Sequence, residues 1–304
     1  MLKNDIYLSA TDALVPASGR VQLVQGEAWG RYADLFKACD EHYRNDPQRK
    51  SFRVEHAGLS HRVSVIPAQA RQVFCIRKFS SEVKSIHSLR LPEAYVRQTL
   101  AQKLTGLVLF SGPTHSGKTT TCSAWVSERL SQYSGVAIAV EDPVELPLEG
   151  PHGDGYCYQI DAYDLGGYAQ AMRDIVRMSP NIIFIGEIRD EESASEVIRA
   201  AINGHTIGAT IHADDPISAV LRLRALAEPF LGEKIDHLLA EGLSLVMHQT
   251  LTERAGVQLP EVQFLSLYGQ EYAGWKDLIR TGKHHQLVSA ISEQKTKARM
   301  EAIT

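Results

Sequence analysis

The sequence lacks any uninterrupted run of about 18 apolar residues, which is the length that a membrane-spanning helix requires. The segment 1–10 also lacks the apolar core of a secretory signal peptide, because Lys3, Asn4 and Asp5 stand where that core would be. We therefore expect a soluble, cytoplasmic protein. Any association with the inner membrane would be peripheral and would depend on a partner.

Cysteine is scarce, and positive charge is not in excess. The four cysteines among 304 residues form no C-x-x-C pair, which argues against a zinc knuckle or a disulfide framework. The net charge of -4 gives no indication of a polyanionic partner, so we expect no nucleic-acid binding.

A glycine-bounded loop follows the apolar stretch 107–110 and leads into a helical pattern. Its spacing is that of the Walker A motif, and although so short a pattern also occurs by chance, both flanks fit here. Glycine allows consecutive N–H groups to surround a polyphosphate, and the helix directs its positive end at the anion. Lys118 would reach the β- and γ-phosphates, and Thr119 would place its hydroxyl on Mg²⁺. The predicted nucleotide-binding residues are Gly112, Pro113, Thr114, His115, Ser116, Gly117, Lys118, Thr119 and Thr120.

The segment 5–79 has the pattern of a small α+β unit, with several stretches that alternate apolar and polar residues. Aromatic and apolar residues recur at helical spacing over 29–36 and are predicted to be core. The predicted strands are 6–8, 21–24, 52–54, 62–66 and 73–76. The predicted domains are 1–80, an α+β domain; 81–104, a linker (80–91) with a helix from Pro92 to about Lys103; and 105–304, a nucleotide-binding domain with C-terminal helices.

After Phe110 buried strands alternate with helices, which predicts an α/β fold with a parallel sheet. The strand predicted at 136–140 is followed at once by Glu141 and, four residues on, by Glu145. Because parallel strands deliver chemistry at their carboxyl ends, these acids fall on the rim that carries the loop. An acidic turn alone is most often solvated, but beside a phosphate loop such a carboxylate can orient or deprotonate water.

Two further strand ends carry candidate site residues. The strand predicted at 181–186 ends in Glu187, which fits a Walker B acid that holds Mg²⁺ directly or through water. The strand at 206–211 is bracketed by His205 and His212, about 23 Å apart on an extended strand, which argues against a metal pair. Only His212 lies at the carboxyl end, so we predict that it senses the terminal phosphate, while His205 is packed or hydrogen-bonded.

Arg173 and Arg177 lie four residues apart on one face of a helix predicted over 168–178. Two interpretations stay open for them, a solvated face or a contact with a neighbouring subunit or a phosphate.

Four segments taken in order resemble the Walker A, Asp box, Walker B and His box of the secretion-ATPase superfamily of type II and type IV systems. They are 112–119, 141–145, 186–190 and 204–213. Within that superfamily the chain is most similar to the PilT-like pilus-retraction ATPases. The resemblance extends over nearly the whole chain, since 5–9 is similar to the opening strand of those proteins and 279–291 to their C-terminal helices.

The resemblance implies a hexameric ring ATPase in which a PAS-like N-terminal domain precedes a RecA-like P-loop NTPase domain. ATP and Mg²⁺ would bind where the two domains meet. By the resemblance, Glu141 activates the attacking water, with Glu145 as the alternative, Glu187 supports Mg²⁺ and His212 lies near the γ-phosphate. The arginines that would act on the phosphates are Arg62, Arg71 and Arg77, for which solvated edge-strand positions are the alternative.

The chain departs from the family at several positions. His115 stands where glycine is usual, and Ala213 replaces a threonine. The segment 275–280 differs from the Ala-Ile-Arg helix of the retraction proteins, which also continue beyond Thr304. These two differences bear on pilus retraction more than on ATP hydrolysis. The lack of the four-cysteine zinc element and of the extra N-terminal domain is expected to argue against an assembly or type II secretion motor.

Three functions follow as hypotheses. The first is a cytoplasmic motor that couples ATP hydrolysis to interdomain motion and acts on an inner-membrane platform protein of a type IV pilus or type IV secretion machine. The second is a nucleotide-binding regulatory subunit of the same machinery with weak or no hydrolysis. The third is a DNA-translocating RecA relative, which the slight acidity of the chain disfavours.

Overall fold

The computed structural model describes residues 5–17, 20–69, 71–254 and 256–301, and it divides into two compact units. The first unit contains the chain up to Glu82 and also the separate segment Asp142–Pro147. The second contains Val83–Glu141 and the chain from Leu148 onward. Residues 1–4 and 302–304, the ends of the predicted first and last domains, lie outside the described residues, as do Lys3 and Asn4 of the segment tested for a signal peptide.

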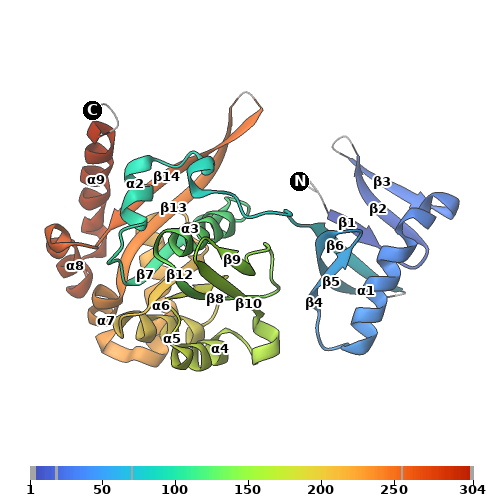
Figure 1. Ribbon diagram of the computed structural model, residues 1–304, viewed down its shortest axis with the longest axis horizontal. Helices are drawn as coiled ribbons and strands as arrows, with labels where there is room; N and C mark the ends of the chain where they lie inside the picture. Colours follow the sequence, from blue (N-terminus) through green and yellow to red (C-terminus); the bar gives the residue numbers. More distant parts are fainter. Residues whose placement is uncertain (1–4, 18–19, 70, 255, 302–304) are drawn as a thin grey trace. The chain divides into compact units, whose positions relative to one another are not determined.

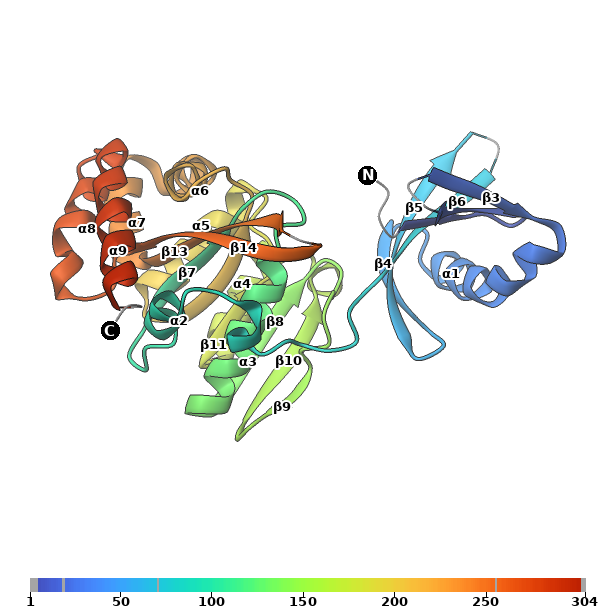
Figure 2. The ribbon, with the colours of Figure 1, turned by 90° about the horizontal axis from the view of Figure 1, so that it is seen from above.

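An antiparallel sheet of six strands forms the first unit, and helix α1 (Ala33–Asn45) lies along one of its faces (Figure 2). The strands, in spatial order, are β3 (Arg20–Gln25), β2 (Asp12–Ala17), β1 (Asp5–Leu8), β6 (Arg71–Lys78), β5 (Leu59–Ala68) and β4 (Ser51–His56). Five of them were predicted. The sixth, β2, was missed because Pro16 and two alanines give its sequence a weak strand signal.

Aromatic side chains pack together in the core of this unit. Phe52 and Phe74 are fully buried, and Phe36 of α1 packs on Phe74 with ring centroids 5.7 Å apart. The indole N–H of Trp29 donates to the carbonyl of Ser9 at 3.1 Å. The aromatic set predicted over 29–36 is therefore core.

An eight-stranded sheet forms the centre of the second unit (Figure 1). Its strands, in spatial order, are β14 (Val257–Ser266), β13 (Leu243–Arg254), β7 (Gly106–Ser111), β12 (Thr206–Ile211), β11 (Ile182–Ile185), β8 (Gly135–Glu141), β10 (Gly155–Asp161) and β9 (Gly150–His152). The six inner strands are parallel, and the outer strands β14 and β9 pair antiparallel. The predicted α/β class with a parallel-sheet core is confirmed.

Helices cover both faces of this sheet. The α-helices are α2 (Glu93–Thr99), α3 (Lys118–Tyr133), α4 (Tyr168–Ile175), α5 (Glu191–Ile202), α6 (Pro216–Leu231), α7 (Ile235–Gly242), α8 (Ala273–Arg280) and α9 (Leu287–Glu301). The short 3₁₀ helices of both units are η1 (Gly26–Tyr32), η2 (Ile86–Leu89), η3 (Ala162–Leu165), η4 (Val176–Met178), η5 (Gly232–Lys234), η6 (Gln270–Tyr272) and η7 (His284–Gln286).

The side chains of β7 alternate between two cores. Leu107 and Leu109 pack among α4 to α7, whereas Val108 and Phe110 pack among α2 and α3. A strand buried on both faces reads as a continuous apolar run, which is why the sequence predicted it closely. The C-terminal helix α9 lies against β14 and α2 (Figure 1).

The segment predicted as a linker and a helix, 81–104, packs mainly into the second unit. Ile86 and Leu104 are almost fully buried there. Helix α2 ends at Thr99, earlier than predicted, because the Thr99 carbonyl accepts the indole N–H of Trp125 at 2.9 Å instead of continuing the helix. Over the residues that the structure describes, none of the helices is long and apolar enough to cross a membrane.

Candidate active site

The loop between β7 and α3 has the backbone of a phosphate cradle. Gly112 (φ +149°) and Gly117 (φ +87°) adopt conformations that favour glycine, and α3 begins directly at Lys118. A Cβ on Gly112 would lie 2.1 Å from the carbonyl oxygen of Gln249, so only glycine fits there. His115 also has a positive φ of +65° and is exposed at the tip of the loop.

Three predicted site residues from three motifs form one polar chain. The Lys118 ammonium donates to the Pro113 carbonyl at 2.8 Å and lies 3.4 Å from Nδ1 of His212. On its other side, Nε2 of His212 is 3.1 Å from a carboxylate oxygen of Glu187. The second Glu187 oxygen accepts from Nε of Arg189 at 2.6 Å. The predicted Walker A lysine, His-box histidine and Walker B acid are therefore brought together.

The surroundings of His212 favour its neutral form. Burial lowers the pKa of this imidazole, the neighbouring Lys118 charge lowers it further, and Glu187 opposes both effects. An ammonium group can only donate, so Nδ1 accepts from Lys118 and Nε2 carries the proton towards Glu187. An anion that draws the Lys118 ammonium towards itself would therefore change the hydrogen bond between Lys118 and Nδ1 of His212.

Glu141 ends β8 and is only 2% exposed. One of its carboxylate oxygens accepts from the side-chain amide of Gln159 at 2.8 Å. Gly186, which follows β11, leaves room for the Glu141 side chain, because an added Cβ at this glycine would lie only 3.1 Å from Cγ of Glu141. The predicted water-activating acid is therefore buried at the carboxyl edge of the parallel sheet.

The remaining predicted site residues lie in the first unit, where the structure gives each of them a charged partner. Glu145 pairs with Arg62 at 3.1 Å. Arg77 makes a two-pronged contact with the Asp5 carboxylate, at 2.7 Å through each nitrogen. Arg71 pairs with Asp12.

Contacts within the chain are seen for Arg173 and His205. Arg173 forms a partly exposed ion pair with Glu192 at 2.6 Å, and for Arg173 and Arg177 both interpretations, a solvated face or a contact with a neighbouring subunit or a phosphate, stay open. Nδ1 of His205 lies 3.2 Å from the Ala200 carbonyl, so His205 is hydrogen-bonded as predicted.

The donor set fits Mg²⁺ bound together with a phosphate. No cluster of three or more histidine, cysteine or carboxylate side chains occurs in the parts of the chain that the structure describes, so a metal site made by the protein alone is not formed there. Mg²⁺ needs no such cluster, because it commonly takes one or two protein oxygens and completes its shell with phosphate and water. Thr119 at the start of α3 and Glu187 supply oxygens of this kind.

Two contacts that the sequence analysis missed come from β13. His248 is buried, and its Nδ1 lies 3.2 Å from the hydroxyl of Ser111, the residue before the loop. Its neighbour Gln249 contacts the loop directly. A signal was present, since His248 and Gln249 directly follow the apolar run 245–247.

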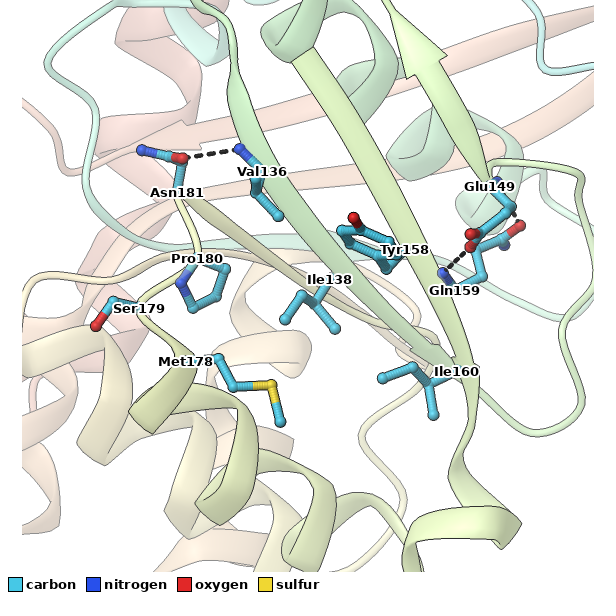
Figure 3. A pocket seen from close by; sticks show the side chains of 10 residues that line it. All are labelled: Val136, Ile138, Glu149, Tyr158, Gln159, Ile160, Met178, Ser179, Pro180 and Asn181. Atoms are coloured by element: carbon cyan, nitrogen blue, oxygen red, sulfur yellow. Dashed lines mark hydrogen bonds between the residues drawn. The ribbon is translucent and has the colours of Figure 1, made fainter.

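A separate pocket of about 470 Å³ opens beside β8, β10 and η4 (Figure 3). Figure 3 shows Ile138, Ile160, Met178 and Pro180 around it, with the Gln159–Glu149 contact to one side. Its lining contains none of the predicted site residues.

Comparison with known proteins places the chain in a family. The family described as "Type II/IV secretion system protein" matches residues 37–293. Type II secretion system protein E of Klebsiella pneumoniae is 32% identical over 68% of this chain and 40% of its own length. The type IV pilus assembly ATPase TfpB of Acinetobacter baylyi is 34% identical over 56% of this chain and 29% of its own. The chain thus spans less than half the length of these curated relatives.

Solved structures share the fold over more of the chain. The pilus retraction motor PilT with bound ADP superposes with a TM-score of 0.78 at 23% identity, over 94% of this chain and 84% of that one. The Legionella pneumophila ATPase DotB superposes with a TM-score of 0.75 at 19% identity, over 94% and 83%. At identities of 23% and 19% these similarities show the fold alone. The family is shown by the match over residues 37–293, which is most of the sequence. The chain therefore belongs to the type II/IV secretion system protein family.

Proposed function

We propose that this protein is an ATPase that converts ATP hydrolysis into movement between its two units and powers a type IV pilus or type IV secretion machine. The observation that carries the proposal is the contact chain from Lys118 through His212 to Glu187 beside a loop with phosphate-binding geometry. The named ATPases among the relatives support it.

Each residue has a role in this proposal. The loop amides and Lys118 bind the β- and γ-phosphates. Thr119 and Glu187 would hold Mg²⁺, which would supply positive charge beside those phosphates. Glu141 accepts a proton from the attacking water, and Glu145 is the alternative base. When the γ-phosphate draws Lys118 away from His212, the His212–Glu187 contact is free to change, so the presence of that phosphate is relayed to the Walker B acid.

The first-unit arginines are proposed to contact the nucleotide. Arg62, Arg71 and Arg77 each pair with a carboxylate in the structure, so a phosphate would replace that carboxylate. A triphosphate offers more negative charge and more acceptor oxygens than one carboxylate, which makes the exchange favourable for a guanidinium.

The assembly is proposed from the family resemblance. We propose a homo-oligomer, a hexameric ring in the cytoplasm, attached peripherally to the inner membrane through a platform protein and without a nucleic-acid partner. The first unit would be the PAS-like domain and the second the RecA-like domain, so that 83–104 would belong to the RecA-like domain and 142–147 to the PAS-like domain.

Lys118→Ala tests the proposal directly. Phosphate release from ATP, followed with malachite green with and without Mg²⁺, should be lost in this variant while the circular dichroism spectrum is kept. Lys103→Ala, at an exposed lysine of the same unit, is the matched control and should keep the wild-type rate. Retained hydrolysis in Lys118→Ala would refute the assignment.

A regulatory subunit with weak or no hydrolysis is the second candidate. It is favoured by His115, which places a bulky side chain with a positive φ at the tip of the loop. Tight ATP binding by the wild-type protein without phosphate release would select this candidate.

A further inference from the structure

The side chain of Gln249 makes two hydrogen bonds, one to the phosphate loop and one to the helix that follows it. Its side-chain Nε2 donates to the Ser116 carbonyl at 2.5 Å. Its Oε1 accepts from the hydroxyl of Thr121, in the first turn of α3, at 2.8 Å. The residue is 5% exposed, so water does not compete freely for either bond. One amide thereby joins the end of the loop to the start of the helix.

The two bonds require one orientation of the amide. A backbone carbonyl can only accept, so the group that faces Ser116 must be the NH₂, and the oxygen then faces the Thr121 hydroxyl, which can donate. Neither a carboxylate nor an apolar side chain of the same shape can make both contacts.

The bond to Ser116 also fixes the next amide. In a planar trans peptide the C=O of Ser116 and the N–H of Gly117 point in opposite directions. Because the Ser116 carbonyl is bonded to Gln249, the Gly117 N–H is directed away from Gln249, to the side that we propose for the phosphate. A Cβ on Gly117 would lie 2.7 Å from Nε2 of Gln249, so glycine at 117 and glutamine at 249 are fitted to each other.

The side chain of Ser116 does not supply this restraint. Its hydroxyl is buried and has no hydrogen-bond partner among the described residues. Of the two side chains, Gln249 and Ser116, only Gln249 is hydrogen-bonded to the 116–117 peptide, through the Ser116 carbonyl.

We propose that Gln249 is a positioning residue for nucleotide binding, which holds the 116–117 peptide with its N–H inward before a phosphate arrives. The inference rests on the proposed function of the loop as the phosphate site. Orienting the amide in advance spares the ligand the free energy of ordering it.

Gln249→Glu tests this with a change of one group, and Gln263→Glu, at an exposed glutamine of the neighbouring strand β14, is the matched control. Mg²⁺–ADP binding, measured by titration calorimetry, should weaken about tenfold or more in Gln249→Glu and stay unchanged in Gln263→Glu. Thr121→Val, which keeps the bond to Ser116, should weaken binding less. Equal affinity of Gln249→Glu and wild type would overturn the proposal.

Two measurements separate positioning from a general loss of structure. The carboxylate that Gln249→Glu introduces can only accept, whereas the protonated acid can donate to the Ser116 carbonyl. The binding defect of this variant relative to wild type should therefore shrink as the pH falls from about 8 to about 6. A defect that is constant with pH would overturn the proposal.

Hydrogen exchange over 112–117 is the second measurement. It should be faster in nucleotide-free Gln249→Glu than in nucleotide-free wild type, and unchanged exchange would overturn the proposal as well. Failure of the wild-type protein to bind ADP would instead refute the proposed function, and the exchange measurement would still decide the role of Gln249.

Discussion

Glu141→Gln separates the chemistry of Glu141 from its structural contacts. The carboxylate is buried and accepts a hydrogen bond from Gln159 at 2.8 Å, and a glutamine side chain at this position keeps an oxygen for that bond. The substitution adds no heavy atoms, which matters because Gly186 leaves little space beside the side chain. It removes one negative charge and the ability to accept a proton from water.

The two expected effects differ in direction. A positioned general base contributes about 10²- to 10⁴-fold, which corresponds to about 3–5 kcal/mol of the activation barrier. Phosphate release should fall by that factor. The free energy of unfolding should stay the same or rise, because an amide costs less to bury than a carboxylate.

The assay is steady-state phosphate release together with ATP binding by calorimetry and urea unfolding. Glu149→Gln is the control, because Glu149 accepts the backbone N–H of Gln159 but is not a predicted site residue. This variant should hydrolyse ATP at the wild-type rate. A full rate in Glu141→Gln would show that the base lies elsewhere, with Glu145→Gln as the next variant to measure. A loss of stability in step with the loss of rate would show that Glu141 acts through the fold.

Three further predictions concern the loop, the core and pH. His115→Gly relieves a positive φ that costs about 1 kcal/mol outside glycine, so turnover should be unchanged or faster in the phosphate assay, and a dead enzyme would show that the imidazole takes part in the mechanism. Gly208→Ala places a Cβ 2.7 Å from the Trp125 ring and should lower stability by about 1–3 kcal/mol in urea unfolding, whereas wild-type stability would mean that the indole moves freely. Burial lowers the pKa of both His212 and His248, so the unfolded chain takes up protons that the folded chain does not, and stability should be constant above about pH 6.5 and fall below it. His248→Gln should show a smaller fall between about pH 7.5 and 5.5, and identical slopes would contradict this account.

Local sequence was sufficient to predict where a residue lies when that residue directly follows a buried parallel strand. Strands β7, β8 and β11 contain continuous apolar runs and β12 is wholly buried, and the residues just after these strands must lie on one edge of a parallel sheet. The meeting of Lys118, Glu187 and His212 could be predicted for that reason.

Contacts between distant segments could not be predicted in this way. Gln249 reaches the loop from a strand far along the chain, and only the pairing of β13 with β7 brings it there. The partner of Arg77 is likewise set by the register of β1 against β6, which places Asp5 opposite it. Side-chain pairs of this kind depend on tertiary arrangement, for which the sequence carries no spacing rule.

The segment Asp142–Pro147 belongs to the first unit although both of its neighbours in the chain belong to the second. The backbone therefore passes between the units three times, and one of these passages follows Glu141 directly. Removing residues 1–82 would leave the segment 142–147 behind without the rest of its unit, and Glu145 would lose Arg62. The first unit is therefore not one continuous N-terminal segment of the chain. If the two units move as proposed, the peptide that follows the proposed catalytic base is one of the three chain connections that join them.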